Sequence, residues 1–117
     1  MIRVLLVDDQ TLVRQGVRTL LDLSSDIRVV AEASDGQQAI EVIPKEKPDV
    51  VLLDMRMPVK SGLDVLRELG PTGKLPPTII LTTFDDDELV LAGLKAGVRG
   101  YLLKDVSLEQ LVNAIHT

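Results

Sequence analysis

The sequence predicts an α/β fold: a doubly wound, five-stranded parallel sheet with helices on both faces. Short apolar runs alternate five times with longer segments whose apolar residues recur at helical spacing. Several runs are apolar without interruption, as expected for parallel strands that helices cover on both faces. The predicted strands cover residues 2–7, 28–33, 50–53, 78–81 and 101–103. The predicted helices cover residues 11–21, 36–44, 63–70, 86–96 and 107 onwards.

Three helix boundaries carry local signals. We expect the second helix to end near Pro44, because proline cannot continue a helix. Gly97 is expected to cap the end of the fourth helix. Ser107, with Gln110 three residues on, predicts a capping box at the start of the fifth helix.

Composition limits the classes of protein to which the chain can belong. A length of 117 residues is that of one domain, and 45% hydrophobic residues are enough for a packed core. The absence of cysteine excludes disulfides and thiolate metal sites and agrees with a cytoplasmic location. We see no signal peptide and no apolar run near the ~20 residues of a membrane span. With a net charge of −5 and no basic stripe, the chain is a poor nucleic-acid binder by itself.

Polar side chains stand where four of the predicted strands end. Asp8 and Asp9 follow the first strand, Asp54 the third, Thr82 the fourth and Lys104 the fifth. The carboxyl ends of parallel strands meet at one edge of the sheet, where ligands bind. None of these five residues follows the second strand, so we place that strand at the outside of the sheet, beyond the first. The flavodoxin-like strand order 2-1-3-4-5 has this property.

The three acids predict a divalent metal site. Asp8, Asp9 and Asp54 repel one another when all are ionised and close, and a hard cation removes that repulsion. Mg²⁺ is the expected ion, with Mn²⁺ as a substitute, because it prefers oxygen ligands and bridges carboxylates to phosphate. The Lys104 amine and the Thr82 hydroxyl would bind oxygens of a phosphoryl group. Taken singly, Asp8-Asp9 could instead cap a helix, and Thr82 and Lys104 could be ordinary strand and surface residues.

Four motifs in the chain resemble those of the receiver domains of two-component response regulators. The motifs are Val7-Asp8-Asp9, Leu53-Asp54-Met55-Arg56-Met57-Pro58, Leu81-Thr82-Thr83 and Gly100-Tyr101-Leu102-Leu103-Lys104. They are spread over the whole chain in the family's order and spacing. The stretches 81–86 and 100–105 further resemble the NarL/FixJ (LuxR-type) branch of that family.

The resemblance implies a function for the acidic site. Asp54 would be the phosphoacceptor and would receive a phosphoryl group from a sensor histidine kinase. Mg²⁺ would be bound by Asp9, Asp54 and the backbone carbonyl of Arg56, with Asp8 acting through water. The protein would then be a phosphorylation switch, with self-catalysed phosphotransfer and autodephosphorylation as its only chemistry.

The resemblance also implies how the switch is read. Thr82 and Lys104 would grip the phosphoryl group, and Tyr101 would change rotamer with the activation state. The output would be a phosphorylation-dependent homodimer. Its interface would be the first and fifth helices or, alternatively, the face of the fourth helix, fifth strand and fifth helix.

The resemblance bears on domain organisation as well. Members of this branch usually carry a C-terminal helix-turn-helix domain. We therefore expect residues 1–117 to be the receiver part of a longer transcription regulator that contacts DNA only through that further domain. The alternative is a stand-alone receiver that acts by protein–protein contact. No membrane partner is expected.

Two positions depart from the commonest family pattern and affect the expected backbone. Asp105 follows Lys104 where many receivers have proline, and a cis bond there would cost ~3 kcal/mol or more. We therefore expect a trans peptide or a strained loop. Val59 stands where glycine is frequent, and we expect its turn to avoid a positive φ.

Three other classes of protein share some of these features. A phosphatase of the haloacid dehalogenase type also uses a strand-end aspartate and Mg²⁺, but it needs a second aspartate two residues on, where this chain has Arg56. A flavin mononucleotide carrier needs a glycine- and hydroxyl-rich phosphate loop after the first strand, where this chain has Asp8-Asp9-Gln10. A degenerate receiver would fold without being phosphorylated, but none of the five strand-end residues suggests degeneration.

Arg56, Thr83 and Phe84 lie near the predicted site and are expected to modulate its reaction rates. Thr83 stands where alanine or glycine is usual, and its β-branched side chain would narrow access to the phosphoryl group. Thr83→Ala should therefore change the rate of phosphotransfer or of dephosphorylation without abolishing either. Rates measured side by side for the two proteins test this, and equal rates would refute it.

Overall fold

The computed structural model describes residues 1–55, 57, 59–82, 87–103 and 108–116. Within these ranges, five strands form one parallel sheet in the order β2-β1-β3-β4-β5, which confirms the predicted fold class and strand order. The strands are β1 (Ile2–Val7), β2 (Ile27–Ala33), β3 (Val50–Asp54), β4 (Thr78–Thr82) and β5 (Gly100–Leu103). The helices are α1 (Thr11–Asp22), α2 (Gly36–Glu46), α3 (Gly62–Leu69), the 3₁₀ turn η1 (Gly70–Thr72), α4 (Asp87–Lys95) and α5 (Leu108–His116).

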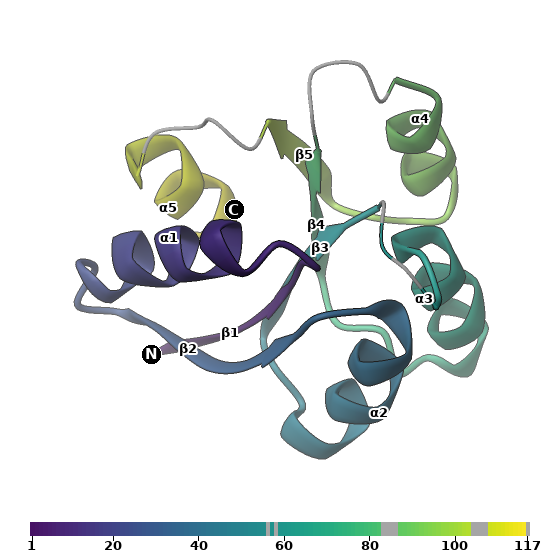
Figure 1. Ribbon diagram of the computed structural model, residues 1–117, viewed down its shortest axis with the longest axis horizontal. Helices are drawn as coiled ribbons and strands as arrows, with labels where there is room; N and C mark the ends of the chain where they lie inside the picture. The colour runs from purple at the N-terminus through teal and green to yellow at the C-terminus, as the bar shows by residue number, and fades with distance from the viewer. Residues whose placement is uncertain (56, 58, 83–86, 104–107, 117) are drawn as a thin grey trace.

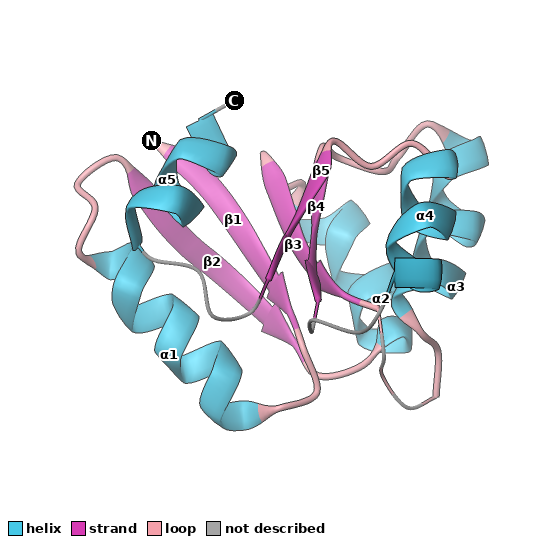
Figure 2. Cartoon of the chain, turned by 90° about the horizontal axis from the view of Figure 1, so that it is seen from above, coloured by secondary structure: helices cyan, strands magenta, loops and turns pink. Residues whose placement is uncertain are grey.

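The sheet divides the apolar core into two layers. Helices α1 and α5 cover one face, and α2, α3 and α4 cover the other (Figures 1 and 2). Leu21 of α1 and Leu111 of α5 pack in the first layer with Leu52 of β3, whereas Ile43 of α2 packs in the second with Leu53. Successive residues of a strand point into opposite layers. Both sets of β3 side chains are therefore buried, which is why β3 is apolar until its last residue. No helix in the described ranges has the length and apolar character to cross a membrane.

The predicted end of the second helix is wrong, because α2 continues through Pro44 to Glu46. Proline lacks the N–H that would donate to the carbonyl four residues back, so one helical hydrogen bond is lost. The next turn still closes, since the Lys47 N–H donates to the Ile43 carbonyl at 2.9 Å. The helix ends only where Lys47 adopts a left-handed conformation with φ of 47°.

The glycine cap predicted for the fourth helix is confirmed. Gly97 has φ of 100°, and its N–H donates to the Leu94 carbonyl at 3.2 Å. The Val98 N–H donates to the Gly93 carbonyl at 3.3 Å, which completes a Schellman motif. The capping box predicted at Ser107 lies outside the described residues.

Two backbone hydrogen bonds hold the loop between β3 and α3. The Gly62 N–H donates to the Met55 carbonyl at 3.2 Å, and the Gly36 N–H donates to the Lys60 carbonyl at 2.9 Å. A Cβ built on Gly62 would lie 2.4 Å from the Asp54 carbonyl oxygen, and one on Gly36 would lie 2.2 Å from that of Lys60. Only glycine permits these approaches, so both ends of the loop after Asp54 are fixed by backbone contact.

The backbone at Val59, within this loop, differs from the prediction. Val59 has φ of 65°, in the left-handed region that β-branched residues rarely adopt. Its side chain is 78% exposed, so packing does little to offset the strain. The following helix starts with a capping box between Ser61 and Asp64, which fixes the exit from the turn. The surrounding contacts therefore impose a conformation that the residue itself disfavours.

Replacing Val59 should expose the strain as a gain in stability. Val59→Gly removes a left-handed penalty of about 1–2 kcal/mol and restores about 0.5–1 kcal/mol of chain entropy to the unfolded state. We expect the free energy of unfolding in urea to rise by up to about 1 kcal/mol. Val59→Ala is the matched control, because it keeps a Cβ and should gain much less. Equal gains in both variants would show that exposed apolar surface, not backbone strain, is the cause.

An ion pair ties the end of α5 to the loop before β2. His116 Nε2 lies 2.8 Å from Asp26 Oδ2, and the Ser24 hydroxyl donates to Asp26 Oδ1 at 2.7 Å. The Ser24 hydrogen bond, and to a smaller extent the His116 charge, hold the pKa of Asp26 below its ordinary value. All of this lies at the surface, where ion pairs contribute little to stability.

Candidate metal and phosphoryl site

Three carboxylates converge at the carboxyl end of the sheet, as the sequence predicts. Asp8 and Asp9 directly follow β1, and Asp54 is the last residue of the neighbouring strand β3. One carboxylate oxygen from each residue lies within 4.8 Å of the other two. Asp8 and Asp54 are only 2% and 4% exposed, whereas Asp9 is exposed. The cluster therefore has two buried acids and one that faces solvent.

Asp8 is held through both its backbone and its side chain. Its N–H donates to the Ala33 carbonyl of β2 at 3.1 Å, and its Oδ1 accepts from the Gln10 N–H at 2.8 Å. Gln10 is the N-cap residue of α1, and the first turn of that helix contains no acid. The structure therefore does not support the alternative in which Asp8 and Asp9 serve as a helix cap.

Arg14, which is not among the residues predicted for the site, contacts the same loop. Its Nη1 donates to the Asp8 carbonyl oxygen at 2.6 Å, and its Nε lies 3.3 Å from Glu32 Oε1 on β2. Only 15% of the Arg14 side chain is exposed. Glu32, a partly buried acid on β2, was the signal in the sequence that a cation would lie nearby.

Thr82 and Tyr101 lie on the next two strands. Thr82 ends β4, which pairs with β3, and is 2% exposed, so its position agrees with a role beside Asp54. Tyr101 of β5 is 52% exposed and lines a pocket of about 310 Å³ between β5 and Ala114 of α5. The other predicted site residues lie outside the described residues, as does the peptide bond before Asp105. These residues are Arg56, Thr83, Phe84 and Lys104.

The donor set fits a hard divalent cation. Octahedral Mg²⁺ binds oxygens at ~2.1 Å, so two opposite ligands are ~4.2 Å apart. The spacing among the Asp8, Asp9 and Asp54 oxygens, up to 4.8 Å, is close to that span. Direct ligation by two acids with the third acting through water therefore needs little movement. Without a cation, charges this close in a partly buried site would repel strongly.

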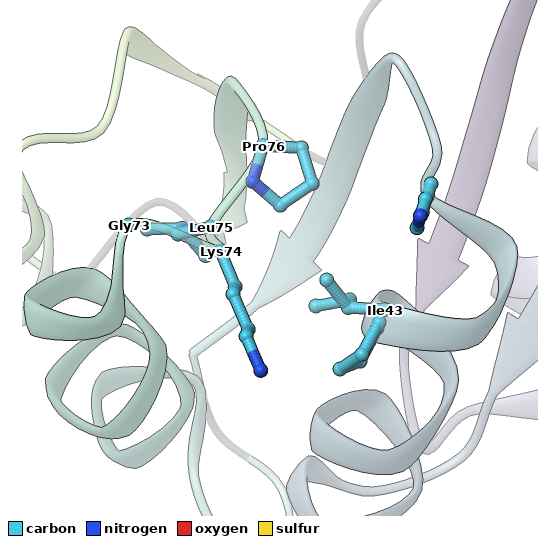
Figure 3. Close-up of a pocket in the computed structure, with 7 residues that line it drawn as sticks. Ile43, Gly73, Lys74, Leu75 and Pro76 are labelled. Atoms are coloured by element: carbon cyan, nitrogen blue, oxygen red, sulfur yellow. The ribbon is translucent and has the colours of Figure 1, made fainter.

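A pocket larger than the one beside Tyr101 lies near the amino ends of the strands, opposite the acidic site, and its lining has different chemistry. A pocket of about 530 Å³ separates the end of α2 from the loop before β4. Ile43 lines it from α2 and Lys74 and Pro76 line it from the loop, and the Lys74 side chain extends across from Ile43 (Figure 3). Its lining is apolar with two lysines and contains no carboxylate, so it offers no metal ligands.

Comparisons with known proteins identify the family. The family model of the response regulator receiver domain matches residues 4–116. The uncharacterized transcriptional regulatory protein YxjL of Bacillus subtilis (strain 168) is 46% identical over 116 residues, which cover 97% of this chain and 52% of that protein. The nitrate/nitrite response regulator protein NarL of Escherichia coli (strain K12) is 41% identical over 116 residues, with the same coverage. The chain therefore belongs to the response regulator receiver domains.

A solved structure agrees with this assignment. The signal receiver domain of NarL from Mycobacterium tuberculosis has a TM-score of 0.89 and 38% sequence identity, covering 98% of this chain and 93% of that one. Other similar structures are of LuxR-family response regulators. The predicted NarL/LuxR-type branch is thus confirmed, and the flavin-carrier interpretation is set aside. The chain spans about half the length of the curated relatives it matches.

Membership of this family relates the acidic cluster to phosphoacceptor domains that bind Mg²⁺. Response regulator receiver domains are phosphoacceptor switches of two-component systems, and the partner of such a switch is a histidine kinase. An acidic cluster such as Asp8, Asp9 and Asp54 is typical of the Mg²⁺ site of these domains. The comparisons and the geometry therefore point to the same edge of the sheet.

The cluster predicts that divalent cations stabilise the fold. At a free Mg²⁺ concentration of 100 times Kd, binding should add about 2.7 kcal/mol to the free energy of unfolding. Asp9→Asn should lose most of this gain because it removes a ligand, yet it should not destabilise the metal-free protein because it also removes repulsion. Thermal unfolding with and without Mg²⁺ measures both effects. Asp22→Asn, an exposed acid at the end of α1, is the control and should respond like the parent protein.

Proposed function

We propose that this domain accepts a phosphoryl group on Asp54 from a sensor histidine kinase in a Mg²⁺-dependent reaction. The observation that carries the proposal is the Asp54 carboxylate, 4% exposed at the end of β3, with oxygens of Asp8 and Asp9 within 4.8 Å. Three carboxylates this close, two of them buried, repel one another, and a Mg²⁺-dependent phosphoacceptor site would bring a cation to offset that repulsion.

In the proposed step, a carboxylate oxygen of Asp54 attacks the phosphorus of a phosphohistidine. A P–O bond forms, the P–N bond breaks, and the released imidazole of the kinase takes up a proton. Bound Mg²⁺, held by Asp9, Asp54 and the carbonyl of Arg56 with Asp8 acting through water, would neutralise charge on the transferred group. Thr82 and Lys104 would bind two of its oxygens. Positioning and electrostatics of this kind are most of what phosphoryl transfer requires.

The phosphoryl group would act as a switch by favouring one of two conformations. Thr82, buried at the end of β4, would be drawn toward the new acyl phosphate. Tyr101, half-exposed on β5, would turn inward in the phosphorylated state. A group on Asp54 can shift this equilibrium only as far as its interactions differ between the two states.

For the whole protein, we propose a cytoplasmic transcription regulator in which residues 1–117 control a C-terminal helix-turn-helix domain. Support comes from relatives that are transcriptional regulatory proteins about twice as long as this chain. Phosphorylation would promote a homodimer through α1 and α5, or through α4, β5 and α5. A receiver that acts by protein–protein contact alone is the second candidate, and the only enzymatic activity proposed is self-catalysed phosphotransfer and autodephosphorylation.

Intact mass spectrometry after incubation with acetyl phosphate tests the acceptor residue. The expected result is one phosphoryl adduct that requires Mg²⁺ and is absent from Asp54→Asn. Asp49→Asn, which changes an exposed acid at the other end of β3, is the matched control and should be modified normally. If purified histidine kinases and acetyl phosphate both leave the parent protein unmodified, the domain is a degenerate receiver. Steady hydrolysis of p-nitrophenyl phosphate would instead favour the phosphatase alternative.

A further inference from the structure

Arg14 connects the acidic site to two elements that lie outside it. Its guanidinium donates to the Asp8 carbonyl oxygen at 2.6 Å and is 3.3 Å from Glu32 Oε1. Arg14 is on α1, Asp8 is on the loop that carries two of the three acids, and Glu32 is on β2. One planar group therefore holds a helix, a loop and an edge strand together. The fixed fork of arginine suits such a double contact better than lysine would.

The Asp8 carbonyl has a direct effect on where the acids lie. The N–H of Asp8 is fixed to Ala33 on one side, and its carbonyl is fixed by Arg14 on the other. These two contacts hold the peptide planes on either side of Asp8. The peptide plane held by Arg14 leads directly into Asp9, the exposed member of the cluster, which has fewer neighbours to orient it.

From these contacts we propose that Arg14 is a positioning residue that sets the affinity of the acidic site for divalent cations, with Glu32 orienting it. The inference rests on the proposed Mg²⁺ site. Arg14 would act through the backbone of Asp8, without touching the metal. Contacts of this outer kind commonly change metal affinity by roughly 10-fold or more when removed.

Electrostatics alone predicts the opposite result, which makes the inference testable. A positive charge near three carboxylates competes with a cation, so removing it should tighten metal binding. Glu32 is paired with Arg14 and already offsets part of that charge. If positioning dominates, replacing Arg14 weakens binding, and if charge dominates, the same replacement strengthens it.

Arg18 provides a matched control. Its Nη1 lies 2.6 Å from Glu32 Oε2, so it shares the same carboxylate, but its side chain is 49% exposed and bonds to the other carboxylate oxygen from the one near Arg14. Arg18→Met therefore removes a positive charge and a Glu32 ion pair while leaving the contact between Arg14 and Asp8. Arg14→Lys keeps the charge but lacks the fixed guanidinium fork that reaches Asp8 and Glu32 together.

The experiment is Mn²⁺ binding followed by electron paramagnetic resonance of the free ion, at a temperature where metal-free unfolding curves show every variant folded. We expect Kd to rise roughly 10-fold in Arg14→Met, by a smaller factor in Arg14→Lys and Glu32→Gln, and less than 2-fold in Arg18→Met. A merely structural role would lower thermal stability in the Arg14 variants and leave the Kd of the folded protein unchanged. A Mn²⁺ affinity of Arg14→Lys that lies between those of Arg14→Met and the parent protein is the second sign of a positioning role.

Each other outcome overturns the inference in a distinguishable way. Equal Kd values in all folded variants would show that Arg14 has only a structural role. Tighter binding in Arg14→Met would show that its charge outweighs its positioning. If Arg14→Met does not fold, Arg14→Lys still decides the question, because it keeps the charge and changes only the geometry of the contact. A parent protein that binds no Mn²⁺ would refute the proposed metal site itself, and this inference with it.

Discussion

The structure depends on one electrostatic constraint: two nearly buried carboxylates at the ends of adjacent strands lie beside a third. Apolar strands that must be covered on both faces bring Asp8 and Asp54 into surroundings where charge is poorly solvated. The sheet cannot retain β1 and β3 as neighbours without also bringing these acids together. What would be a liability in a purely structural domain suits the cation site, and the phosphoryl transfer, that we propose here.

Fixed backbone around the site makes this constraint useful. Gly62 approaches the Asp54 carbonyl more closely than any residue with a Cβ could, and Gly36 does the same at Lys60. Both contacts hold the segment that follows Asp54, the proposed phosphoacceptor, and we attribute the strain at Val59 to that closure. The rigidity at Asp54 and the strain five residues later therefore have a common origin. Geometry that is fixed before the reaction need not be organised during it.

The sequence predicts the fold well because the apolar pattern of strands and helices repeats five times. It predicts much of the site because the parallel topology brings the ends of the strands together. Strand identity followed from uninterrupted apolar runs, and the site followed because parallel strands end at one edge. The errors share a different cause. Local propensity predicts a helix end near Pro44 and a negative φ at Val59. The hydrogen bond from Lys47 to Ile43 and the backbone contacts around Gly62 override these preferences. Glu32 indicates a nearby cation, but the contact of Arg14 with Asp8 was missed because a backbone carbonyl leaves no side-chain pattern in the sequence.

The contact between Arg14 and Asp8 also bears on how a signal would leave the site. Binding couplings are reciprocal: if Arg14 raises the affinity for a cation, the cation must stabilise the contact that Arg14 makes. That contact begins on α1, which lies beside α5 and away from α4 (Figures 1 and 2). The route through Thr82 and Tyr101 instead runs along β4 and β5. Occupation of the metal site would thus favour order at α1, whereas phosphorylation would act mainly on β4 and β5. The two proposed dimer faces would then differ in which of these events they depend on.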